Sequence, residues 1–213
     1  MQTRTFKNTV SLCTVGLTLL VACAGPLITS APRLFQGDLE VERVADLIIA
    51  EGAEGAEGTK RAGGRLQNGF NPIDISRHIV SLSRSYGLDP FLILAIVKVE
   101  SGFRPSVRSC AGAIGLMQVM PIVIRAVGRE VSVHRREDLY DPYKNLHLGI
   151  HYLTFLLEKY GNMERALVAY NVGPSALDKI LSRRNFVPSS YARKILLCYK
   201  LYREKARTPI DLT

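Results

Sequence analysis

The stretch PFLILAIVKVES, residues 90–101, constrains the fold of this chain more than any other. Apolar residues would occur on every side of the helix that it forms, which is typical of a helix buried in a protein core. Asp89 and the proline after it supply a helix N-cap and a first-turn residue. A single carboxylate, Glu100, lies at the other end, just before the turn at Gly102. The sequence therefore predicts a central, buried helix that carries one acid at its C-terminal end.

The rest of the chain from about residue 72 also has helical periodicity, and no convincing apolar-polar alternation predicts a strand. Residues 111–128 begin with glycines and are interrupted by Pro121, which predicts a short helix, a break and a second helix. The other predicted helices cover residues 75–86, 89–100, 145–160 and 163–171, a helix beginning near 174, and 188–205. We expect an all-α domain over residues 72–205.

The first 24 residues have the pattern of an export signal, because Arg4 and Lys7 precede the apolar stretch VSLCTVGLTLLVACAG. This stretch is shorter than the roughly 20 residues of a membrane-spanning helix. The letters ACA fit cleavage by an ordinary signal peptidase, whereas LVAC, which ends at Cys23, is similar to the bacterial lipobox, in which the cysteine is lipidated. Three fates stay open: lipidation at Cys23, plain secretion, and a retained anchor.

Residues 25–71 are expected to link the signal to the domain. Within them GDLEVERVADLIIAEG has Leu39, Val44, Leu47 and Ile48 at helical spacing, which predicts a short amphipathic helix. The following EGAEGAEGTKRAGGRLQNG is rich in glycine, alanine and charge and has no apolar period. Such a composition predicts a flexible tether.

The charge of the chain narrows its partners only partly. With 28 basic and 19 acidic residues, its formal net charge is +9 at pH 7. A basic surface favours nucleic acid, anionic lipid or an acidic polymer. The sequence has no RNP-type motif, zinc-ligand spacing or dense Lys/Arg run, so we expect no nucleic-acid partner.

Histidines and cysteines give weaker signals. His147 and His151 are four residues apart, but no third ligand is apparent, so we expect no metal and no other cofactor. Outside the signal region the cysteines are Cys110 and Cys198. In an oxidising compartment this pair is compatible with one disulfide, and equally with two unpaired thiols.

The predicted position of Glu100 should raise its pKa. The negative end of the helix dipole disfavours a carboxylate, and apolar surroundings disfavour the ionised form by desolvation. A carboxyl that stays protonated near neutral pH is what a general acid for a glycosidic oxygen requires. The alternative is an exposed glutamate at a helix end with no chemical role.

Three motifs in order, VESGF, GAIGLMQVMP and ALVAYNVGP, resemble the catalytic domain of the soluble-type (family 1, SLT-domain) lytic murein transglycosylases, relatives of goose-type lysozyme. The similarity runs from about residue 72 to 200. It implies a lysozyme-like α-helical domain with a cleft for the glycan strands of peptidoglycan. By this resemblance Glu100 matches the catalytic acid/base. The other matched positions place the substrate or line the cleft: Ser109, Gln118, Met120, Tyr170, Asn171 and Tyr191.

The number of carboxylates bears on the reaction. Most glycoside hydrolases use two, whereas the sequence near Glu100 supplies one. Asp138 and Asp141 are the nearest later candidates, but DPY is more typical of a helix start. The resemblance implies that the bond between N-acetylmuramic acid and N-acetylglucosamine is cleaved without water, with formation of a 1,6-anhydro ring. The alternatives are a lysozyme-type hydrolase and a non-catalytic module for wall binding or assembly.

These expectations together describe a protein of the cell envelope. We expect it in the periplasm, with a lipid anchor in the outer membrane if Cys23 is lipidated. Its expected partners are peptidoglycan, the membrane through that anchor, and an envelope-spanning secretion machine that the domain would serve.

Overall fold

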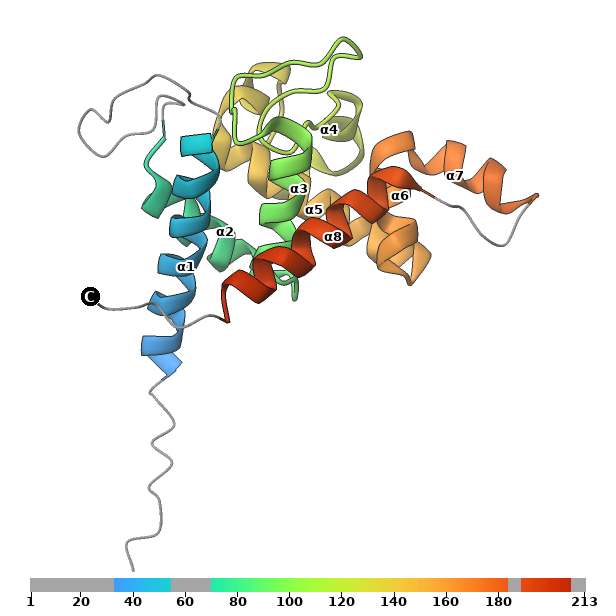
Figure 1. Cartoon of the computed structure of the whole chain (residues 1–213). Coiled ribbons are helices and arrows are strands. Elements are labelled where there is room, and N and C mark those ends of the chain that lie inside the picture. The colour runs from blue at the N-terminus through green and yellow to red at the C-terminus, as the bar shows by residue number, and fades with distance from the viewer. Residues whose placement is uncertain (1–32, 55–69, 184–188, 208–213) are drawn as a thin grey trace, which may run out of the picture. The chain divides into compact units, whose positions relative to one another are not determined.

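The computed structural model describes residues 33–54, 70–183 and 189–207, and all regular elements in these ranges are helical (Figure 1). They are α1 (Arg33–Glu54), α2 (Pro72–Ser85), α3 (Pro90–Ser101), α4 (Ile122–Val127), η1 (Gly128–Val131), η2 (Arg136–Tyr140), α5 (Pro142–Tyr160), α6 (Met163–Val172), α7 (Pro174–Leu181) and α8 (Ser190–Lys205). The predicted all-α class is confirmed. The expected signal, Cys23 and the tether after residue 54 lie outside the described residues.

Polar side chains determine where the helices around the site begin. The Asp89 side chain accepts a hydrogen bond from the backbone N–H of Phe91 at 2.9 Å, as the sequence predicted for α3. Ser189 caps α8 by accepting from the backbone N–H of Ala192 at 3.2 Å. Proline occupies the first turn of α2, α3, α5 and α7, where its missing N–H costs nothing.

Helix α3 is the buried helix of the domain. Every residue from Phe91 to Val97 is buried. The helix packs against α1, α2 and α8, and α8 crosses it along most of its length (Figure 1). A helix that is apolar all round needs neighbours on all sides, and this arrangement provides them.

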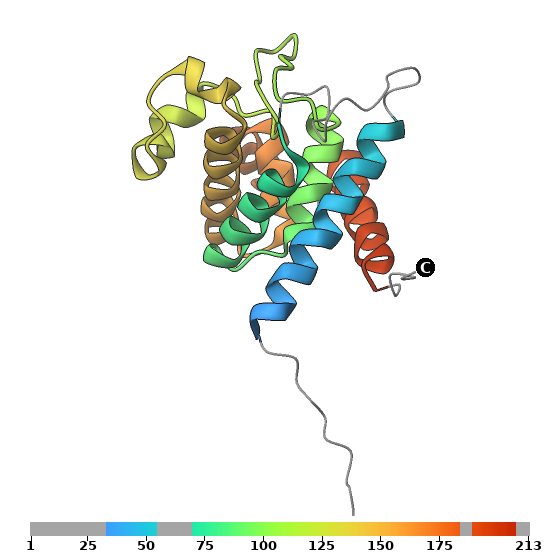
Figure 2. The same ribbon diagram turned by 90° about the vertical axis from the view of Figure 1, so that its left-hand side faces the viewer.

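Helix α1 belongs to the same core. Its residues Val44, Leu47 and Ile48 are buried and pack with the residues of α2 and α3 (Figure 2). The sequence predicted an amphipathic helix here but placed it in the linker ahead of the domain. The compact unit instead begins at Arg33, because the apolar face of α1 is part of the core and not a free surface.

The first helix predicted within residues 111–128 is wrong. Residues 109–120 form a loop held by isolated β-bridges that pair Ile114 with Arg108 and Val119. Gly112, Gly115 and Gln118 have φ angles of 92°, 82° and 47°, which a right-handed helix cannot contain. At Gly115 a Cβ atom would lie 2.2 Å from the side-chain nitrogen of Asn145, so only glycine permits this approach. The second predicted helix is present as α4.

Within the described ranges, no helix combines the length and the apolar character that a membrane span requires.

Candidate active site

Glu100 lies in the last turn of α3, where the buried helix reaches the surface of the core. Its side chain is half-buried. Gly102 ends the helix in the left-handed conformation, with φ of 56°, and its backbone N–H bonds to the Lys98 carbonyl oxygen at 3.1 Å. The chain leaves the helix immediately after Glu100, so no later turn of α3 covers its carboxyl.

Burial raises the pKa of Glu100 above its ordinary value, and a hydrogen bond from the Tyr191 hydroxyl to Oε1 partly opposes this rise. The two nearest cations in the sequence are engaged elsewhere. Lys98 pairs with Glu51 of α1, and Arg104 Nε donates to the Ser101 carbonyl oxygen at 2.9 Å. Glu100 therefore has no ion pair within the described residues, and the raised pKa predicted from the sequence is confirmed.

Two tyrosines lie close to this carboxyl. Tyr191, in the first turn of α8, donates to Glu100, and Tyr170, near the end of α6, donates to the Met117 carbonyl oxygen at 2.8 Å. The ring of Tyr170 packs against that of Tyr152, with 5.7 Å between centroids. Burial and the negative charge of Glu100 raise the pKa of both Tyr170 and Tyr191. Both therefore stay neutral and act as hydrogen-bond donors.

The side chains of Ser109 and Gln118 shape the loop of residues 109–120. Ser109 Oγ accepts a hydrogen bond from the Ala113 backbone N–H at 3.0 Å. Gln118 Nε2 donates to the carbonyl oxygens of Val107 at 3.1 Å and Gly115 at 2.9 Å. These contacts fix the wall of the site, and they leave the carbonyl oxygen of the Gln118 side chain as the group that can accept from a ligand.

The remaining predicted site residues are exposed beside this wall. Met120 follows the loop with 39% of its surface exposed, and Asn171 is exposed next to Tyr170. No hydrogen bond or ion pair of the described residues joins Glu100 to Ser109, Gln118 or Asn171. The structure thus brings Glu100, Tyr170 and Tyr191 together and arranges the other predicted residues around them at a distance.

Asn145 holds the backbone of the loop beside Tyr170, and the sequence did not identify it as a site residue. Its buried side chain accepts from the Met117 backbone N–H at 2.8 Å and donates to the carbonyl oxygens of Ile114 and Leu139, both at 2.9 Å. It thereby fixes the backbone to which Tyr170 bonds. A polar residue on the buried face of a predicted amphipathic helix is the signal that could have identified it.

Glu51 of α1 was missed as well. One of its oxygens accepts from Lys98 Nζ of α3, and the other accepts from the Tyr202 hydroxyl of α8 at 2.7 Å. It therefore ties together the two helices that carry Glu100 and Tyr191. No local pattern could have revealed this, because Glu51 and Tyr202 are 151 residues apart in the sequence.

The two later acids have structural roles. Asp138 accepts from Lys144 Nζ at 2.7 Å and from the backbone N–H groups of His134 and Arg135, which hold its pKa well below the usual range. Asp141 caps α5, in agreement with the sequence interpretation of DPY as a helix start. Neither is free to act as a second carboxylate beside Glu100.

The two histidines of α5 have separate partners. His147 Nε2 lies 3.1 Å from the Tyr86 hydroxyl, and His151 Nε2 lies 2.6 Å from Glu130 Oε2. Within the described ranges, no three potential metal-binding side chains come together.

Cys110 and Cys198 are both free thiols, so the proposed disulfide is absent and the alternative of unpaired cysteines holds. Cys110 is exposed on the loop near Ser109. Cys198 lies half-buried on the middle of α8, where burial raises the pKa of its thiol. The two thiols belong to different neighbourhoods of the domain.

Comparison with known proteins agrees with this arrangement. The Transglycosylase SLT domain family matches residues 78–191, more than half of the chain. Membrane-bound lytic murein transglycosylase C of Glaesserella parasuis is 32% identical over 164 residues, which cover 59% of this chain and 44% of that protein. The chain therefore spans less than half the length of this curated relative.

Solved structures of lytic transglycosylases share the fold. An inactive mutant of lytic transglycosylase Slt from Pseudomonas aeruginosa aligns with a TM-score of 0.55 and 28% identity, over 62% of this chain and 24% of that one. The 70 kDa soluble lytic transglycosylase SLT70 from Escherichia coli aligns with a TM-score of 0.54 and 25% identity, over 61% and 25%. Together with the family match, these similarities establish that the chain belongs to the Transglycosylase SLT domain family.

Proposed function

We propose that this protein is a peptidoglycan lytic transglycosylase that cleaves the β-1,4 bond between N-acetylmuramic acid and N-acetylglucosamine without water. One observation carries the proposal: the single half-buried carboxyl of Glu100 has a raised pKa and no ion pair among the described residues. Membership of the family and the names of its relatives support the same reaction.

In the first step the protonated Glu100 donates its proton to the bridging oxygen, and the bond between C1 and that oxygen breaks. An acid whose pKa is raised by burial is protonated at neutral pH more often than an ordinary glutamate, which favours this step. The acetamido oxygen of the substrate stabilises the oxocarbenium-like centre at C1. The departing N-acetylglucosamine leaves with a new hydroxyl group.

In the second step the Glu100 carboxylate removes the proton from the C6 hydroxyl of the muramic acid, and that oxygen attacks C1. The 1,6-anhydro ring closes, and the carboxyl is restored to its protonated form. One residue acts as acid and then as base, so no second carboxylate is required. The Tyr191 hydroxyl stabilises the charged form of Glu100 between the two steps.

The residues around the carboxyl would hold the glycan strand. The Gln118 side-chain oxygen would accept from an N–H or hydroxyl of the sugar, and exposed Met120 and Asn171 would contact neighbouring sugars. Tyr170 offers a ring for sugar packing, and Ser109 would place the substrate near Glu100. These roles rest on the motif positions of the residues.

We further propose that the protein acts in the cell envelope, with export directed by residues 1–24 and with lipidation at Cys23 as one route to the outer membrane. The sequence pattern supports this, as does the word "membrane-bound" in the names of several relatives. The basic charge of the chain favours adsorption to peptidoglycan, which carries carboxylates. Service to an envelope-spanning secretion machine remains part of this proposal.

The test is mass analysis of the fragments released from purified sacculi by the protein. We expect muropeptides that end in 1,6-anhydromuramic acid and therefore lack one water relative to reducing ends. The Glu100→Gln variant, purified in the same way, should release them about 10²- to 10⁴-fold more slowly.

Other outcomes identify other functions. Reducing ends as the sole product would mean a lysozyme-type hydrolase in which water attacks C1. Binding to sacculi without release of fragments, unchanged in the Glu100→Gln variant, would mean a non-catalytic wall-binding module.

A further inference from the structure

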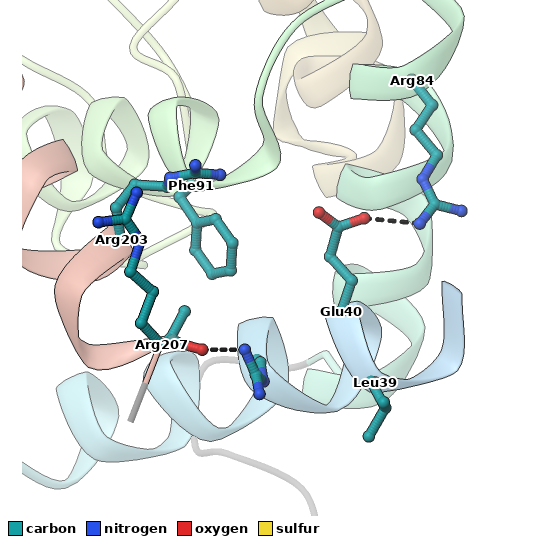
Figure 3. A pocket seen from close by; sticks show the side chains of 8 residues that line it. Leu39, Glu40, Arg84, Phe91, Arg203 and Arg207 are labelled. Carbon is teal, nitrogen blue, oxygen red and sulfur yellow. Dashed lines mark hydrogen bonds and ion pairs between the residues drawn. The ribbon is translucent and has the colours of Figure 1, made fainter. Parts of the chain in front are cut away.

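A second candidate site lies at the start of α3 and the end of α8, whereas Glu100 and Tyr191 lie at the opposite ends of these helices. A cavity of about 460 Å³ opens between α1, the end of α2, the start of α3 and the end of α8 (Figure 3). Phe91 lines it, nine residues before Glu100, which corresponds to about 13 Å along the axis of α3. The cavity is therefore separate from the cleft around Glu100.

Arginine is the dominant side chain of this cavity. Arg43 of α1, Arg84 of α2, Arg203 of α8 and the adjacent Arg207 all line it (Figure 3). They come from segments far apart in the sequence, so the fold, not a local basic run, brings them together. Like charges that converge in this way repel one another unless anions lie among them.

Carboxylates compensate only two of these four charges. Arg84 pairs with Glu40 at 2.6 Å, and Arg203 pairs with Asp89 at 2.9 Å. Within the described ranges, Arg43 and Arg207 have no carboxylate partner. Arg43 donates one N–H to the Ala206 carbonyl oxygen, and its buried Nε finds no hydrogen-bond partner among those residues. A buried donor without a partner is costly.

The wall of the cavity also has an apolar part. The ring of Phe91 faces into it from the first turn of α3, and Leu39 lies at its edge (Figure 3). The volume falls within the range typical of small-molecule sites, roughly 300–1,000 Å³. A ligand that satisfies the whole cavity has an anionic end for the arginines and an apolar body for Phe91.

We propose that this cavity binds a phosphate monoester, with the phosphate among the arginines of its wall and its organic part against Phe91. A phosphate monoester carries about −1.5 to −2 charge at neutral pH, which matches the two uncompensated arginines better than a single carboxylate does. Guanidinium groups bind phosphate oxygens in a bidentate manner. The phosphate belongs to a free small molecule or to a lipid headgroup, and the two sources share this chemistry.

The experiment measures binding of phenyl phosphate to the full chain by calorimetry at low ionic strength, with benzoate as the singly charged comparison. We expect phenyl phosphate to bind more tightly than benzoate. Its affinity should fall at least tenfold in the Arg43→Gln/Arg207→Gln variant. The Arg125→Gln/Arg129→Gln variant, which removes the same charge from exposed positions on α4 and η1, should bind as the unchanged chain does.

A vesicle arm distinguishes the two sources of phosphate. Phosphatidylcholine vesicles with and without phosphatidic acid are sedimented with the unchanged chain and with both variants. Binding that depends on phosphatidic acid and on Arg43 and Arg207, without binding of phenyl phosphate, supports the proposal with a lipid as the ligand.

The fold must survive for these comparisons to count. Arg207 is exposed, so Arg207→Glu alone serves as the test if thermal unfolding shows that the double variant is destabilised. Equal losses in the pocket variant and the control would assign binding to the diffuse basic surface and overturn the proposal. The proposal is also overturned if benzoate binds as tightly as phenyl phosphate. It is overturned as well if the chain binds neither phenyl phosphate nor the vesicles that contain phosphatidic acid.

Discussion

Glu100 and Glu51 each accept a hydrogen bond from a tyrosine of α8, yet their pKa values move in opposite directions. Burial raises the pKa of Glu100, and the hydrogen bond from Tyr191 does not reverse the rise. Burial would also raise the pKa of Glu51, but hydrogen bonds from Lys98 and Tyr202, with the charge of Lys98, lower it overall. The two sites have a partly buried carboxyl and a phenol in common, and they differ in the lysines, chiefly Lys98, that lower the pKa of Glu51.

The geometry of α3 determines which of the two carboxylates pairs with Lys98. Lys98 precedes Glu100 by only two residues, but side chains two apart on a helix point in different directions and do not face each other. Lys98 therefore reaches Glu51 on α1 and leaves Glu100 unpaired. Helix α1, which lies outside the segment matched by the family, supplies the carboxylate that pairs with this lysine.

The largest expected effect separates the two carboxylates by function. The Glu100→Gln variant should digest sacculi about 10²- to 10⁴-fold more slowly, because the acid that protonates the leaving oxygen is lost. Its melting temperature should not fall, since an amide resembles the protonated carboxyl that burial already favours. The rate of release of muropeptides and a thermal unfolding curve check both parts. Digestion within tenfold of the unchanged protein would refute the role of Glu100.

The next effect concerns stability. The Glu51→Gln variant should lower the free energy of unfolding by about 1–3 kcal/mol, because Lys98 is left partly buried without its partner. The side chains of Glu51 and Lys98 are 11% and 37% exposed, so solvent screens part of the loss. Denaturant unfolding measures the change.

The matched control for this effect is the Lys98→Met variant combined with Glu51→Gln. If the pair stabilises the protein, the double variant should lose less than the two single losses added together. Strictly additive losses would show that Glu51 and Lys98 act independently of each other.

The sequence predicted the properties of Glu100 but not those of Glu51. The position of Glu100 after an apolar helix predicted its burial and its raised pKa, because both follow from a contiguous stretch of sequence. Asp89 and Asp141 likewise identified helix starts by local hydrogen bonding. The family motifs added Tyr191, although not its bond to Glu100.

The features that the sequence did not predict depend on contacts between segments that are distant in the chain. Glu51 was interpreted as part of a linker helix, since no local pattern indicates which helices α1 will contact. A short helix was predicted before Pro121, whereas Asn145, which belongs to another helix, holds the backbone of this segment as a loop. The arginines of the cavity are also scattered along the chain, so composition recorded their charge and not their convergence.

The tyrosine hydroxyls beside Glu100 and Glu51 can be removed one at a time to compare the two carboxyls. The Tyr191→Phe variant loses the hydrogen bond that favours the ionised form of Glu100, so the pKa of Glu100 should rise further. The acid form then persists to higher pH, and the basic limb of the pH profile of kcat/KM should move upward. Tyr202→Phe, the same change beside Glu51, should leave that limb in place. A downward shift in Tyr191→Phe would contradict the assignment of Glu100 as the acid.

The smallest expected effect is the pH dependence of stability, which should have opposite signs at the two carboxyls. The ordinary pKa of both is 4.5. Since the folded state raises the pKa of Glu100, ionising Glu100 destabilises the fold as pH rises above 4.5, and the Glu100→Gln variant should gain relative stability there. Since the folded state lowers the pKa of Glu51, its stabilising effect is present above 4.5 and is lost as pH falls below it, so the deficit of Glu51→Gln should shrink in acid.

Thermal unfolding of the unchanged protein and the two variants across this pH range measures both trends. Their opposite direction is the useful signal, since a general effect of pH on the fold would move both variants in the same sense. Parallel curves for Glu100→Gln and Glu51→Gln would mean that the folded state shifts both pKa values in the same direction and that Lys98 does not separate the two carboxyls.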